Sequence, residues 1–203
     1  GSTAESYDAT PYAKMASTKA LSDTIIRRNL DAVLVDGLTA PSFHIKRKIR
    51  NNPKVSIIIP TKDRLNLVKQ CVESVEKLTK TYDFTYEIVI VNHESVEPET
   101  IAYFDMIRDK HKILDYKGVF NYSAINNFAV KNCDGDYLVL LNNDTEVVAE
   151  DWLYEMLQLA QEDGVGAVGA RLLFPNETIQ HAGVYIHENG VGGHIYHGFW
   201  KNS

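Results

Sequence analysis

The sequence is short of three features, and each shortage excludes a class of protein. It holds only two cysteines, Cys71 and Cys133, in 203 residues, which excludes the small secreted proteins that disulfides hold together. Both lie in helix-like patterns and indicate buried thiols in a reducing compartment, with a single disulfide as the open alternative. No apolar run approaches the roughly 18 residues that a membrane helix needs. The net charge of -6 argues against nucleic acid as the main partner.

Signals for export and for phosphate binding are also missing. The opening residues Gly1–Glu5 are small, polar and acidic, unlike a secretory signal peptide, so we expect a cytoplasmic protein. No glycine-rich phosphate loop follows the first β-branched run, Val55–Ile59. This absence counts against a dinucleotide-binding enzyme and against a P-loop nucleotidase.

From Pro53 onward the sequence alternates between apolar runs and helical stripes. Runs rich in Val, Ile and Leu predict strands at residues 55–59, 87–91, 113–116, 137–141 and 165–168. Spacings of three and four predict helices at residues 65–78, 98–107, 123–131 and 152–160. This alternation is typical of an α/β fold, Rossmann-like, with a mostly parallel sheet and helices on both faces. We expect the first strand to stop at Pro60 and the run Leu138–Leu141 to be fully buried.

Residues 1–52 are predicted to form an extension of one helix and short strands ahead of a domain at residues 53–203. The helix begins at Pro11, which suits a first turn. The segment Phe43–Arg50 is the most basic in the chain. It fits a contact with phosphate or an anionic membrane, but we favour an edge strand with solvated charges.

Polar side chains follow the predicted strands, at the edge where an open parallel sheet binds its ligands. These segments are Pro60–Arg64, Asn92–Ser95, Gly118–Tyr122 and Asn142–Glu146. Asp144 suits a hard divalent cation whose other ligands are waters and phosphates. An equal alternative is that Asp144 caps the next turn, as Asp and Asn often do.

Six segments together carry a resemblance to a known family: Val55–Thr61, Glu87–Val91, Phe120–Asn127, Leu140–Val147, Val165–Ala170 and Ile179–Val184. They resemble the family-2 glycosyltransferases, which have the GT-A fold. The resemblance extends from about Val55 to Gly198. It points to the bacterial branch that builds cell-surface polysaccharides and is rhamnosyltransferase-like.

The resemblance implies a nucleotide-diphosphate-sugar donor, a glycan or lipid-linked glycan acceptor, and no nucleic acid. By their match to the family's motifs, the residues that bind the donor nucleotide would be Pro60, Thr61, Asp63, Asn92, Asn127, Asn142 and Asn143. It further implies Mn²⁺ or Mg²⁺ at Asp144 and an inverting transfer to an acceptor hydroxyl. The full-length protein would act in the cytoplasm or at the inner face of the membrane.

Three positions depart from the family's pattern. Asn92 stands where the family usually has an aspartate, Asn142–Asp144 holds a single carboxylate, and Asn126 replaces an arginine. The family's catalytic base lies in a later acidic motif. We therefore expect the base beyond Ser203, and a truncated domain that binds a donor but transfers little sugar.

Other interpretations stay open beside a transferase. A sugar-1-phosphate nucleotidylyltransferase has a related sheet, but its glycine-rich, basic signature is missing. A degenerate, non-catalytic module that binds a donor or a partner within a larger glycosyltransferase fits the departures above. His194 and His197 have a spacing that could bind zinc on a helix, but Gly192 and Gly193 precede them and no cysteine lies nearby, so we favour loop or surface residues. His93, at a strand end, has no assigned role.

Overall fold

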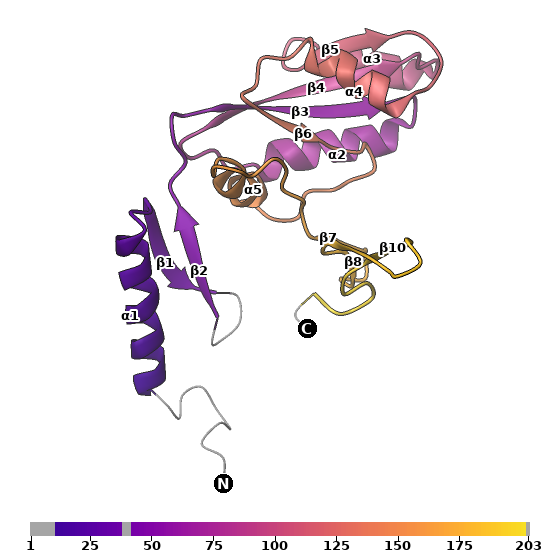
Figure 1. Cartoon of the computed structure of the whole chain (residues 1–203). Coiled ribbons are helices and arrows are strands. Elements are labelled where there is room, and N and C mark those ends of the chain that lie inside the picture. Colours follow the sequence, from indigo (N-terminus) through magenta and orange to yellow (C-terminus); the bar gives the residue numbers. More distant parts are fainter. Residues whose placement is uncertain (1–10, 38–41, 202–203) are drawn as a thin grey trace. The chain divides into compact units, whose positions relative to one another are not determined.

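The structure is a computed structural model, and it describes residues 11–37 and 42–201 (Figure 1). The chain divides into two units, residues 1–48 together with 158–203, and residues 49–157. The domain boundary predicted between residues 52 and 53 stays a prediction. No helix within the described ranges combines the length and apolarity that a membrane crossing requires.

A parallel four-stranded sheet forms the centre of the unit 49–157, which confirms the predicted α/β fold. Its strands are β3 (Lys54–Thr61), β4 (Thr85–His93), β5 (Lys112–Tyr116) and β6 (Tyr137–Leu140). They lie in the order β5-β4-β3-β6, and each neighbouring pair is parallel. The chain moves outward from β3 to β5 and then returns to the far side of β3, so the strand order reverses at β3. Parallel sheets bind ligands beyond their carboxyl ends at such a reversal.

Helices cover both faces of this sheet (Figure 1). They are α2 (Leu65–Leu78), α3 (Pro98–Ile107), α4 (Tyr122–Val130) and α5 (Trp152–Ala160). Residues from α2, α3 and α5 share one apolar cluster with Ile57 and Ile59 of β3. Ile125 and Ala129 of α4 pack against Ile58 on the opposite face. Alternate residues of β3 thus supply both cores, as expected for a strand buried on two faces.

The first strand does not stop at Pro60, contrary to the prediction. β3 continues to Thr61, and Pro60 is paired with Val91 of β4. Ile58 accepts a hydrogen bond through its carbonyl from the N–H of Leu141, so the backbone of Ile58 faces β6. The nitrogen of Pro60, two residues later, points to the same side of β3 as the carbonyl of Ile58. At the level of Pro60, β6 has already ended. The missing N–H therefore costs no hydrogen bond of the ladder.

The run that ends at Leu141 is not fully buried, which corrects a second prediction. β6 is an edge strand, and Leu138 and Leu140 are 44% and 53% exposed on the face that α4 covers elsewhere. Tyr137 and Val139 pack against the opposite cluster. A half-buried edge strand can be as apolar in sequence as a central strand. The strands and helices that lie beside a strand decide how far its residues are buried.

The described part of the extension holds α1 (Pro11–Arg27), β1 (Ala32–Asp36) and β2 (Phe43–Arg47). β1 and β2 pair antiparallel, so the basic segment is an edge strand, as favoured. Arg47 Nε lies 3.8 Å from a carboxylate oxygen of Glu162. At least one positive charge of this segment is therefore engaged in an ion pair within the chain.

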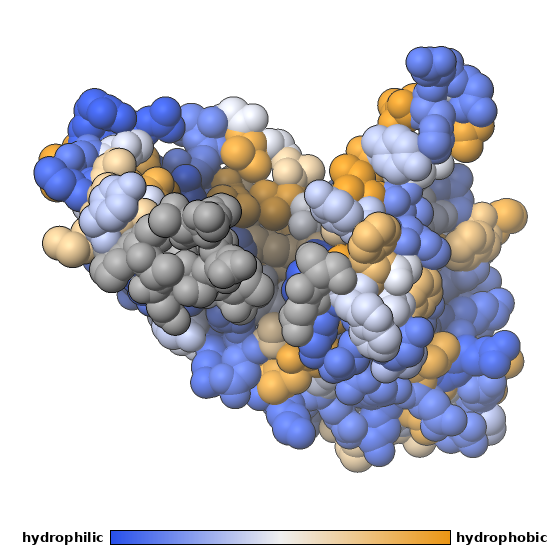
Figure 2. All heavy atoms as spheres, turned by 90° about the horizontal axis from the view of Figure 1, so that it is seen from below, coloured by the Kyte–Doolittle hydropathy of each residue, from blue (hydrophilic) through white to orange (hydrophobic). Residues whose placement is uncertain are grey.

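The segment after α5 forms short strands, β7 (Leu172–Leu173), β8 (Ile179–His181), β9 (Val184–Ile186) and β10 (Gly192–His194). The strand predicted at residues 165–168 is absent, since residues 165–171 form neither helix nor strand. Gly166 and Gly169 in this segment weaken it as a strand, because glycine offers no side chain to pack. On the face shown in Figure 2, exposed hydrophobic residues form separate groups among a hydrophilic majority.

Candidate functional site

Polar side chains form a row along the carboxyl edge of the sheet. Thr61 of β3 is paired with Asn92 of β4, and Asn92 with Asp115 of β5. Asn92 donates a hydrogen bond from Nδ2 to Oδ1 of Asp115 at 2.8 Å. At the other side Asn143, just after β6, donates from Nδ2 to Oγ1 of Thr61 at 2.9 Å. The row therefore runs Asn143, Thr61, Asn92, Asp115, and we call it the edge row.

Asp63 holds the loop after β4 against the loop after β3. Its Oδ1 accepts hydrogen bonds from the backbone N–H groups of Val96 at 2.7 Å and Glu97 at 2.9 Å, directly before α3. Its own N–H donates to Oγ of Ser95 at 2.8 Å. Asp63 has a φ of 53°, a left-handed conformation that Asp and Asn adopt more readily than most residues. One oxygen of this predicted donor residue is thus engaged within the protein.

The turn after β6 carries the predicted metal motif. The N–H of Thr145 donates to the carbonyl of Asn142 at 3.2 Å and closes the turn. Asn142 and Asp144 are exposed, and Asn143 is half-buried. Burial raises the pKa of Cys71 in α2 to about 12, and the negative charge of Asp144 adds to this shift. The Sγ atom of Cys71 lies 3.6 Å from the carbonyl oxygen of Asn142, so this turn packs against the middle of α2.

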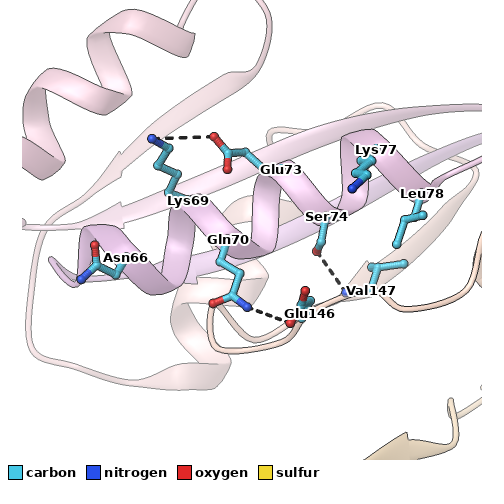
Figure 3. A pocket seen from close by; sticks show the side chains of 9 residues that line it. All are labelled: Asn66, Lys69, Gln70, Glu73, Ser74, Lys77, Leu78, Glu146 and Val147. Carbon is cyan, nitrogen blue, oxygen red and sulfur yellow. Dashed lines mark hydrogen bonds and ion pairs between the residues drawn. The ribbon is translucent and has the colours of Figure 1, made fainter. Parts of the chain in front are cut away.

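A shallow groove beside α2 receives the chain that follows Asp144 (Figure 3). Gln70 donates from Nε2 to Oε2 of Glu146 at 2.7 Å, and the N–H of Val147 donates to Oγ of Ser74 at 3.0 Å. The groove has a volume of about 330 Å³ and is lined by Asn66, Lys69, Gln70, Glu73, Ser74, Lys77, Leu78, Glu146 and Val147. Its two hydrogen bonds fasten the end of the metal-motif turn to α2.

Two predicted donor residues, Asn127 and Pro60, lie outside both the edge row and the loops beside it, toward the face of the sheet that α4 covers. Asn127 is exposed on α4, on the face of the sheet opposite α2. Pro60 follows Ile58 by two residues and so faces α4 as well. Asn126, the neighbour of Asn127, is buried. Its Nδ2 donates to the carbonyl of Tyr122 at 2.8 Å, and its Oδ1 has no partner among the described residues.

His93, at the end of β4, is buried and holds the loop between β5 and α4. Its Nε2 lies 2.8 Å from the carbonyl oxygen of Gly118. A carbonyl only accepts, so Nε2 carries the hydrogen and donates. The ring centroid of His93 lies 5.8 Å from those of Tyr116 and Phe120. This histidine therefore has a positional role beneath the start of α4.

The zinc site suggested by His194 and His197 lacks the helix it would need. His194 ends β10 and His197 lies in a turn. The Nδ1 atoms of His194 and His181 are 2.8 Å apart, so the two rings form a hydrogen-bonded pair. Among residues 11–37 and 42–201, no group of three or more His, Cys, Asp or Glu side chains is arranged to hold a metal ion.

Sequence reasoning missed three residues that shape the site. Ser95 and Ser74 each accept a backbone N–H, from Asp63 and Val147, and nothing in their spacing indicated this. Asp115 is different, because it stands at the carboxyl end of a predicted strand. The rule that selected Asn92 applies to it as well.

Comparison with known proteins identifies the family to which this chain belongs. The family model described as glycosyl transferase family 2 matches residues 56–200. The chain belongs to glycosyl transferase family 2. The family-2 resemblance stated from the sequence is thereby confirmed, whereas the rhamnosyltransferase-like branch stays a prediction.

Relatives of this family-2 chain include two bacterial proteins of greater length. It is 42% identical over 198 residues to the uncharacterised protein y4gI of Sinorhizobium fredii, covering 96% of this chain and 22% of that protein. It is 40% identical over 193 residues to the O-antigen biosynthesis protein RfbC of Myxococcus xanthus. This match covers 93% of this chain and 14% of RfbC. The chain thus spans less than a quarter of either relative.

A solved structure shares the fold of this family-2 domain. The mannosyltransferase PcManGT from Pyrobaculum calidifontis, in complex with GDP-Man and Mn²⁺, matches with a TM-score of 0.52 and 16% identity. The match covers 83% of this chain and 47% of that chain. At this identity the likeness shows the fold, which is of the GT-A type.

Proposed function

We propose that this domain binds the nucleotide diphosphate of a sugar donor along the edge row. The observation that carries the proposal is the row itself, since Asn143, Thr61 and Asn92 join three strands at the carboxyl edge of a family-2 fold. Asp63 serves this site by holding the loop that follows β4, the strand that carries Asn92. Pro60, Asn127 and Asn142 complete the proposed donor residues through their match to the family's motifs.

Asp144 is the proposed ligand of a divalent cation. Its exposed carboxylate is a hard oxygen donor of the kind that Mg²⁺ and Mn²⁺ prefer, and Asn142 and Asn143 precede it in the chain. One protein carboxylate fits a cation whose remaining ligands are waters and the donor's phosphates. When bound, the cation would neutralise charge that develops on the leaving diphosphate.

In the full-length protein we propose transfer of the sugar, a hexose, with inversion to a glycan or lipid-linked acceptor. RfbC, at 40% identity, is named for O-antigen biosynthesis, which supports a role in bacterial surface polysaccharide synthesis. A rhamnosyltransferase-like enzyme at the cytoplasmic face of the membrane is the specific form of this proposal. The base that deprotonates the acceptor would come from another segment of the protein.

A degenerate donor- or partner-binding module is the second candidate. It is favoured by Asn92, an amide where a carboxylate is usual, and by the single carboxylate of the metal motif. Such a module would keep the arrangement of the edge row but would not bind a nucleotide in a metal-dependent way.

Calorimetric titration with UDP, dTDP and GDP, each with and without Mn²⁺, separates these two functions. The transferase proposal expects metal-dependent binding of at least one nucleotide. Asp144→Asn should weaken that binding by about 10- to 100-fold, the effect of losing one charged interaction. Asp109→Asn is the matched control, because Asp109 is exposed in the turn before β5, at the amino edge. Absence of metal-dependent binding to the wild-type chain would refute the proposal.

A further inference from the structure

Asp115 places a carboxylate at the end of the edge row farthest from Asp144. Asp115 is exposed near the carboxyl end of β5, the outer strand of the sheet. Its Oδ1 accepts the hydrogen bond from Asn92. No other hydrogen bond or ion pair of the Asp115 side chain occurs in the described part of the chain. One oxygen of this carboxylate is therefore available to a ligand.

Asn92 is held in one orientation beside this carboxylate. Its Nδ2 points to Asp115, and its Oδ1 accepts the N–H of Ser95 at 3.0 Å. An N–H only donates and an ionised carboxylate only accepts, so the two contacts fix both ends of the amide. Asn92 thus steadies Asp115 without neutralising it.

The length and charge of the edge row decide which part of a nucleotide meets Asp115. Neighbouring strands lie about 4.8 Å apart, so the step from β6 to β5 covers about 14 Å. This matches an extended nucleoside diphosphate with its phosphates at the cation site of Asp144. Asp115 repels phosphate, so the far end of the row receives the nucleobase.

We propose that Asp115 is a specificity-determining residue that accepts a hydrogen bond from a ring N–H of the donor's nucleobase. Guanine, uracil and thymine present such an N–H on the edge used for base pairing. Adenine and cytosine present an unprotonated ring nitrogen there, which faces a carboxylate unfavourably. The preferred donors are therefore GDP-, UDP- or dTDP-sugars. This inference rests on the proposed donor site and adds the basis of its selectivity.

The test is calorimetric titration of GDP, UDP, ADP and CDP with Mn²⁺ against wild type, Asp115→Asn and the Asp109→Asn control. Asp115→Asn should lose about 10- to 100-fold in affinity for GDP or UDP, and should change little for ADP and CDP. Its melting temperature should stay that of wild type, because the side chain is exposed. Asp109→Asn should bind as wild type does.

A loss of equal size for all four nucleotides would overturn the assignment, because it would indicate a contact with the ribose. An unchanged affinity of Asp115→Asn would overturn it as well, while leaving the donor site intact. If the wild-type chain binds none of the nucleotides, the proposed function fails, and the inference fails with it.

Exchanging the two side chains provides an independent check. Asn92→Asp alone places two carboxylates side by side and should not improve binding, since like charges at hydrogen-bond distance repel. The double variant Asn92→Asp with Asp115→Asn restores one carboxylate and one amide. It should recover at least part of the lost GDP or UDP affinity. A double variant no better than Asp115→Asn would argue against a shared base-reading pair.

Discussion

The hydrogen bonds of Asp63 predict an ordered series of stabilities for substitutions at this position. Oδ1 accepts two backbone N–H groups, and the residue has a φ of 53°. Asp63→Ala removes the acceptor and places a Cβ without a compensating polar group in the left-handed region. Asp63→Gly also removes the acceptor but tolerates the conformation. Asp63→Asn keeps an acceptor oxygen and tolerates the conformation.

The size of each loss in the free energy of unfolding depends on how exposed the two N–H donors are. Val96 is exposed and Glu97 is half-buried, so water replaces part of each lost hydrogen bond. We take about 1 kcal/mol for each bond, and about 1 kcal/mol more for alanine at a left-handed position. The expected loss in the free energy of unfolding is about 2 kcal/mol for Gly and about 3 for Ala. It is about 1 kcal/mol for Asn, because a neutral amide oxygen accepts each hydrogen bond more weakly than a carboxylate does.

Urea denaturation measures this series, and amide hydrogen exchange locates it. Exchange of the Val96 and Glu97 amides should speed up in Asp63→Ala and Asp63→Gly. Asp109→Ala, in an exposed turn, should lose less than about 0.5 kcal/mol. The reasoning is refuted if the Ala and Gly variants match the wild type within about 0.5 kcal/mol. Equal losses for Ala and Gly would refute the conformational part alone.

Two further predictions concern titratable groups of α2. Burial alone would raise the pKa of Glu76, but hydrogen bonds from Lys110 and His111 outweigh it and hold the pKa below its ordinary value of 4.5. The stabilisation by ionised Glu76 is thus present above pH 4.5 and lost as the pH falls through the lowered pKa. The destabilisation by Glu76→Gln, measured by denaturation, should therefore shrink between pH 7 and pH 3, and a constant difference would contradict this. Cys71, with a pKa of about 12, should resist alkylation at pH 8 in the folded chain while the partly exposed Cys133 reacts; equal labelling would argue against its burial.

Local sequence patterns sufficed for the helices, because each pattern acts within its own segment. The stripe Leu65, Val68, Val72, Val75 and Leu78 predicts α2 with the bounds observed. Pro98 predicts the start of α3, since proline fits a first helical turn. Each of these helices has one apolar face, and any sheet can cover such a face.

The burial of β6 and the extent of β3 depended on strand order, which no single segment encodes. Leu138 and Leu140 are apolar yet exposed because β6 lies at an edge. Pro60 continues its strand because β6 ends before reaching it. Both predictions were wrong for the same reason, namely that the neighbour of a strand decides what its residues meet.

The sequence by itself determined that polar residues follow buried parallel strands and that the chain resembles glycosyl transferase family 2. Only the tertiary structure decided which of those residues meet. It set Asn92 beside Asp115, joined Asn143 to Thr61, engaged an oxygen of Asp63 within the loops, and put Asn127 on the opposite face. Register between strands is a non-local property, since a slip of one residue exchanges the faces of a strand. The edge row exists only because that register aligns the ends of the strands.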